Sequence, residues 1–140
     1  MILTALVGGL VALQAPINSG LGRHTGNLPA ALVSFGLGTA LLLVIVIASG
    51  DTGGLRFTFD ARWYYLVGGL LGAAYVTVAL ISVRTIGAGG VAAATITGQL
   101  TTAVVIDRFG LLGLDRTPLS GGRIAGIALL LAGTFLVVRT

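Results

Sequence analysis

Long apolar runs separated by short polar clusters dominate the chain. A transmembrane helix needs about 20 consecutive apolar residues, and somewhat shorter runs are tolerated. The runs without charged residues are 1–22, 25–50, 63–83, 85–106 and 124–138. Within them apolar residues are continuous rather than alternating, which favours helices over a membrane β-barrel. The pattern predicts an all-α integral membrane protein. Residues 1–140 would form a single transmembrane domain with five spans, at about 2–20, 28–49, 63–83, 87–106 and 121–138.

Residues beside the runs suggest where individual helices begin and bend. Asn27 is placed to cap the second predicted helix, and Ser120 to cap the fifth, because both side chains can accept a hydrogen bond from the first turn. Pro16 should kink the first helix, because it lacks a backbone donor. We expect the first span to be retained rather than cleaved as a signal peptide, since no basic segment precedes it.

Composition narrows the class of protein. Hydrophobic residues make up 56% of the chain, charged residues make up 9%, and the mean hydropathy is +1.06. Soluble domains carry about a quarter charged residues, and disordered chains are poor in hydrophobic ones, so both classes are excluded. The sequence contains no cysteine, which excludes disulfide scaffolds, thiolate metal sites and cysteine nucleophiles.

All the basic charge comes from arginine. Eight arginines and four aspartates give a net charge of +4, and the arginines are scattered singly. Scattered arginines are typical of anchors in lipid headgroups, so we expect membrane lipid as a partner and no nucleic acid. Five spans would divide the arginines into Arg56, Arg62, Arg108, Arg116 and Arg123 on the N-terminal side and Arg23, Arg84 and Arg139 on the other. This weak bias places the N-terminus in the cytoplasm and leaves dual topology open.

Nothing in the spans predicts an enzyme. The predicted spans contain no Asp, Glu, Lys or His. The glycine-rich stretch 87–90 lacks the Lys-Ser/Thr that completes a phosphate-binding loop. We therefore expect no catalytic residues, no metal site and no cofactor.

Neutral polar residues inside the spans are the candidates for binding a solute. An amide in hydrocarbon costs several kcal/mol unless it is satisfied, so such residues should face other helices or a hydrated cavity. Gln14 and Asn18 lie four residues apart on one helical face. The candidate substrate-binding residues are Gln14, Asn18, Gln99, Ser34, Tyr75 and Thr95. The alternatives are interhelical hydrogen bonds for the amides, packing for Tyr75, and a bond to the preceding helical turn for the threonine.

Glycine spacing suggests a helix contact. Gly122 and Gly126 lie one turn apart in the fifth predicted span, and small residues at this spacing let two helix backbones approach closely. We expect Gly122 and Gly126 to form a helix-packing or dimer contact.

Four stretches together resemble a known family over nearly the whole chain. They are 14–18 (QAPIN), 31–39 (ALVSFGLGT), 98–99 with 106–114 (IDRFGLLGL), and 118–133. They are similar to the YdcZ-like inner-membrane exporters, a half-sized branch of the drug/metabolite transporter superfamily.

The resemblance implies a half-sized transporter in the bacterial cytoplasmic (inner) membrane, with one structural repeat of the superfamily. It would move a small polar or amphiphilic solute by alternating access. Larger superfamily members contain two such units in inverted orientation, so this chain would form an antiparallel homodimer, or a heterodimer with a related half-transporter. The alternative is a non-transporting membrane subunit or assembly protein. The small multidrug exporters carry a glutamate in the first span, where this chain has only Gln14 and Asn18. Carboxylate-based proton exchange is therefore not expected.

Overall fold

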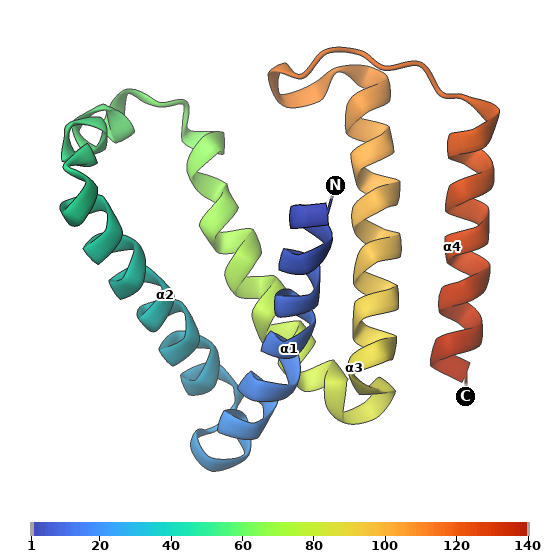
Figure 1. Cartoon of the computed structure of the whole chain (residues 1–140), viewed down its shortest axis with the longest axis horizontal. Coiled ribbons are helices and arrows are strands. Elements are labelled where there is room, and N and C mark those ends of the chain that lie inside the picture. The colour runs from blue at the N-terminus through green and yellow to red at the C-terminus, as the bar shows by residue number, and fades with distance from the viewer. Residues whose placement is uncertain (1, 140) are drawn as a thin grey trace. The chain divides into compact units, whose positions relative to one another are not determined.

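The computed structural model describes residues 2–139, in which every regular element is helical (Figure 1). Its elements are α1 (Ile2–Thr25), α2 (Asn27–Ser49), the 3₁₀ helices η1 (Asp51–Asp60) and η2 (Trp63–Val67), α3 (Gly68–Phe109), the 3₁₀ helix η3 (Leu111–Gly113) and α4 (Gly121–Arg139). The chain forms two compact units. One contains residues 13–84, and the other contains residues 2–12 and 85–139.

Four helical stretches of the described chain are long and apolar enough to cross a membrane. They are Ile2–Thr25, Asn27–Ser49, Trp63–Phe109 and Gly121–Arg139. This confirms the prediction of an all-helical membrane protein. The third stretch contains 47 residues. As one straight helix it would be ~70 Å long, more than twice the ~30 Å of a bilayer core.

The long helix α3 is interrupted at Gly87. This residue has φ 68° and ψ 171°, which is not a helical conformation. Gly87 is the first residue of the fourth predicted span, and the third predicted span ends at residue 83.

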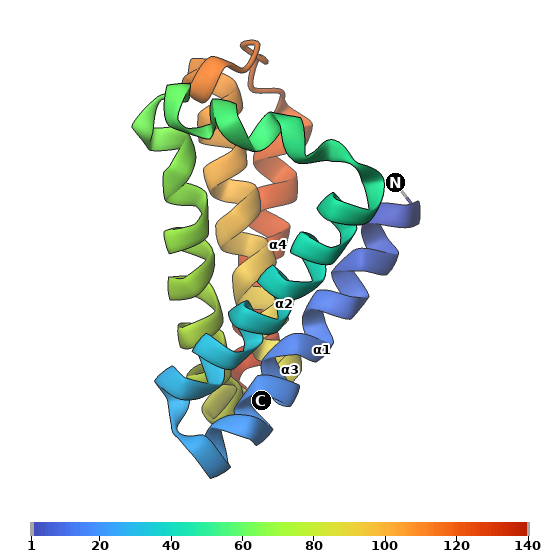
Figure 2. The ribbon, with the colours of Figure 1, turned by 90° about the vertical axis from the view of Figure 1, so that its left-hand side faces the viewer.

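A one-residue turn joins α1 to α2 in the unit 13–84. Gly26 adopts φ 92°, and its backbone N–H donates to the Gly22 carbonyl at 3.0 Å. Figure 2 shows the last turns of α1 and the first turns of α2 meeting at this point. The expected Asn27 cap is wrong. Gly26 occupies the cap position without any side-chain bond, and Asn27 is already the first residue of the helix.

Two alanines, a valine and a leucine form the core of the unit 13–84. Ala30 and Ala31 of α2 are buried with Val76 and Leu80 of α3, and Leu80 is 0% exposed. Around this core pack the half-buried side chains of Leu21, Phe35 and Tyr75.

In the other unit, the part of α3 after Gly87 lies beside α4 (Figure 1). Helix α4 begins at Gly121, and the Arg123 N–H donates to the Ser120 hydroxyl at 3.3 Å, which confirms the predicted Ser120 cap. The preceding loop is joined to α3, because the Thr117 N–H donates to the Asp107 carbonyl at 2.8 Å. Helix α4 is joined to α3 as well, because Arg123 pairs with the Asp107 carboxylate at 3.3 Å. None of the apolar window of α4 is buried. Such a surface is suited to contact with lipid or with another helix.

Candidate functional site

Asn18 and Ser34 form a polar contact between α1 and α2. The Asn18 amide Nδ2 donates to the Ser34 hydroxyl at 3.1 Å, and Asn18 is 6% exposed. The turn at Gly26 brings the two residues together, because it reverses the chain within one residue. Two of the predicted binding residues therefore meet. A buried amide beside a hydroxyl offers both hydrogen-bond donors and acceptors in an otherwise apolar region.

Gln14 and Tyr75 lie in the same unit as this pair. Gln14 is one helical turn before Asn18 on α1, and its side chain is exposed. Tyr75, on α3, is half-buried and packs against the apolar core. These apolar surroundings agree with the alternative that Tyr75 is a packing residue. Of the two amides on α1, Gln14 is the exposed one and Asn18 the buried one.

Gln99 and Thr95 lie on α3 in the other unit. The Gln99 side chain is exposed, and Thr95 is half-buried. A different threonine, Thr97, is buried and forms the polar contact of this unit. Its hydroxyl lies 2.5 Å from the hydroxyl of Thr134 on α4.

Sequence reasoning missed this hydroxyl pair. The Thr97 and Thr134 hydroxyls both lie within hydrogen-bond distance of the Ala93 carbonyl, at 2.9 and 3.1 Å. A threonine hydroxyl usually bonds its own preceding turn, as Thr97 does with Ala93. Because this local bond is expected for a threonine in a helix, the sequence of one helix gives no sign of a second, interhelical contact.

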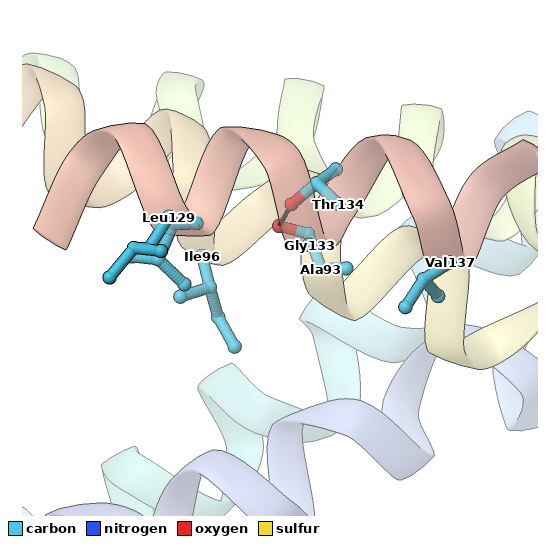
Figure 3. Close-up of a pocket in the computed structure, with 7 residues that line it drawn as sticks. Ala93, Ile96, Leu129, Gly133, Thr134 and Val137 are labelled. Carbon is cyan, nitrogen blue, oxygen red and sulfur yellow. Dashed lines mark hydrogen bonds between the residues drawn. The ribbon is translucent and has the colours of Figure 1, made fainter.

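An apolar groove runs along α3 and α4 beside Thr134 (Figure 3). Its volume is 460 Å³, and it is lined by Ala93, Ile96, Leu129, Leu130, Gly133, Thr134 and Val137. Figure 3 shows the Thr134 hydroxyl turned toward Ala93, with Leu129 and Val137 on either side along α4. The groove offers one hydroxyl and no charge, so its chemistry suits an acyl chain or an apolar helix face.

Arg84 is a further polar residue whose partner the sequence did not indicate. It was expected only as an anchor in the headgroups. Its guanidinium instead reaches α1, where Nε donates to the Ser19 hydroxyl at 2.9 Å and Nη2 donates to the Ser19 carbonyl at 3.2 Å. The two residues are 65 positions apart in sequence, so no local pattern connects them.

Among residues 2–139, no group of three or more His, Cys, Asp or Glu side chains could hold a metal ion.

A family model described as "Putative inner membrane exporter, YdcZ" matches residues 1–136. The chain belongs to this family. The match confirms the resemblance carried by the four sequence stretches, and it includes every candidate binding residue. Together with the apolar helices it identifies a multi-pass membrane protein of an inner-membrane exporter family, a class of transporters rather than of enzymes. No curated protein and no solved structure matches the chain.

Proposed function

We propose that the protein is a transporter subunit that moves a small polar or amphiphilic solute across the cytoplasmic membrane. The family supports export, and the observation that carries the proposal is the polar face of α1. Asn18 is buried and bonded to Ser34, whereas Gln14, one turn away, is exposed. An amide exposed to hydrocarbon is costly, so Gln14 requires water, a solute or a partner helix. Amides both donate and accept, which suits a polar neutral or zwitterionic solute.

We propose five spans, with α3 divided at Gly87. Residues 63–86 and 88–109 are each long enough to cross a bilayer, whereas the whole stretch is too long. Residues 1–140 would then form one transmembrane domain with its two ends on opposite sides.

The two compact units suggest how alternating access would work. The chain passes between them at residues 12/13 and at residues 84/85. The first passage includes Ala12. In a regular helix its carbonyl would accept a hydrogen bond from the backbone N–H of residue 16, but Pro16 has no such N–H. The second lies three residues before the interruption at Gly87. Both passages coincide with a weakened helix, so we propose that the units move as bodies about Pro16 and Gly87.

We further propose a dimer, either an antiparallel homodimer or a heterodimer with a related half-transporter. A Cβ built on Gly126 meets no atom within 4 Å, and one on Gly122 meets only the Ser120 hydroxyl at 3.9 Å. The chain itself therefore does not fill this face of α4. A second helix packed there would use the small-residue spacing noted in the sequence.

Cysteine labelling tests the solute pathway directly, because the natural chain contains no cysteine. We expect Gln14→Cys and Gln99→Cys to react with a hydrophilic maleimide in membrane vesicles, since a thiol ionises only in contact with water. Matched controls are Ile17→Cys and Leu129→Cys, which replace exposed apolar residues, at 67% and 73% exposure, on the same two units. The controls should remain unlabelled. Four unreactive thiols would indicate a dry interior and favour the non-transporting alternative.

The dimer proposal predicts that a bulky residue on the glycine face of α4 separates the subunits. Gly126→Trp should convert the dimer to monomer, because the indole would prevent close approach of two backbones. The mass of the complex in lipid nanodiscs measures this. Gly36→Trp on α2 is the control, because its Cβ position is equally open. A wild-type protein that is monomeric in native-like lipid would contradict the proposal.

A further inference from the structure

A cavity with two arginines lies between α1 and α3 in the unit 13–84. Its volume is 280 Å³, and it is lined by Pro16, Ser19, Gly20, Arg23, Val83 and Arg84. It is separate from the Asn18–Ser34 contact and from the apolar groove beside Thr134, since it shares no lining residue with either. The proposed transport function does not use it.

Among the residues that the structure describes, neither arginine of this cavity pairs with a carboxylate. In the part of the chain that the structure describes, the ion pair found is that of Arg123 with Asp107. Both arginines are exposed, and their two positive charges line one small cavity. An anion bound between them would offset the repulsion of these like charges.

The Arg84 guanidinium is held in place by two hydrogen bonds to Ser19. An arginine has five N–H groups, and the two bonds to Ser19 use one on Nε and one on Nη2. Gly22 leaves room for this arrangement, because a Cβ there would lie 2.9 Å from Nη2. A guanidinium fixed in advance loses little conformational entropy when it binds an oxyanion.

We propose that this cavity binds a phosphate-type oxyanion, held between Arg23 and Arg84. Guanidinium groups match the geometry of phosphate oxygens and form charge-assisted, bidentate hydrogen bonds with them. The same chemistry is offered by the phosphate of an anionic lipid headgroup and by a free phosphate. The bonds of Arg84 to Ser19 alone would merely join α3 to α1, but that structural role does not involve Arg23.

Binding to purified full-length protein in a neutral detergent tests the proposal. The probes are inorganic phosphate, dioctanoyl phosphatidylglycerol and dioctanoylglycerol, which lacks the phosphate, and native mass spectrometry measures their binding. The decisive variant is Arg23→Gln, because Arg23 lines the cavity without contributing to the Ser19 contact. Arg139→Gln is the matched control, since it removes the same charge elsewhere.

We expect Arg23→Gln to weaken binding about tenfold or more, the usual effect of losing a charge-assisted hydrogen bond. Its melting temperature without ligand should stay unchanged, and Arg139→Gln should bind as the wild type does. Arg23-dependent binding of inorganic phosphate supports a site for free oxyanions, and Arg23-dependent binding of phosphatidylglycerol alone supports a headgroup site. The proposal is overturned if neither probe binds, if dioctanoylglycerol binds equally well, or if both variants lose binding to the same extent.

Discussion

Replacing Gly87 with alanine should lower the free energy of unfolding by about 1–3 kcal/mol. Gly87 has φ 68° and ψ 171°, a region of backbone conformation that is open essentially to glycine alone. A Cβ at this position meets no neighbouring atom, so the cost comes from the backbone conformation and not from a clash. Thermal unfolding in detergent, followed by circular dichroism, measures the change.

Gly89→Ala is the control for this substitution. Gly89 lies two residues further along α3 in helical backbone, and its Cβ would meet only Val137 at 4.0 Å. Alanine in a helix interior is favoured over glycine by about 0.5–1 kcal/mol, so this variant should be as stable as the wild type or more stable. Equal gains from both variants would show that α3 continues through Gly87. The five-span proposal would then lose its structural basis.

The helices themselves follow from the sequence, because the physical constraint on them is local. In lipid every backbone polar group must be satisfied within a helix or a closed barrel, and continuous rather than alternating apolar runs favour the helix. The Ser120 cap is equally local, since its partner lies three residues away. The Asn27 cap failed for a local reason too. The positive φ of Gly26 lets α1 pass almost directly into α2, and it moves the cap position back by one residue.

Contacts between helices were harder to predict, because they depend on which faces meet. Asn18 and Ser34 were both candidates, but their pairing depends on the tight turn at Gly26. The contact of Arg84 with Ser19 joins residues 65 positions apart. The contact of Thr97 with Thr134 joins residues 37 apart. Helical periodicity indicates which residues share a face, but not which face packs against which.

The same limit applies to the predicted substrate site. Gln14 belongs to the unit 13–84, and Gln99 belongs to the unit with residues 85–139. Both amides are exposed, so each is free to contribute to a pathway on its own unit. Their roles must therefore be tested one residue at a time.

Gln14→Leu should reduce transport per folded molecule at least tenfold and leave thermal stability unchanged or raised. The side chain is exposed, so leucine removes no internal packing. Uptake by proteoliposomes measures transport, with a panel of zwitterionic amino acids, neutral sugars and amphiphilic cations as solutes. Thr39→Leu on α2 is the control, because it removes a polar group from another exposed position. It should transport as the wild type does.

Asn18→Leu separates the two roles of the neighbouring amide. It removes the 3.1 Å bond to Ser34, and an interhelical hydrogen bond in a membrane is worth about 1 kcal/mol. If Asn18 only joins α1 to α2, the variant should melt at a lower temperature and transport normally per folded molecule. If Asn18 also binds the solute, transport should fall well beyond the loss of folded protein. Ser34→Ala removes the same bond but keeps the Asn18 amide, so it should lose stability and retain more transport than Asn18→Leu. Equal transport by Gln14→Leu, Asn18→Leu and the wild type would show that the polar face of α1 does not line the pathway.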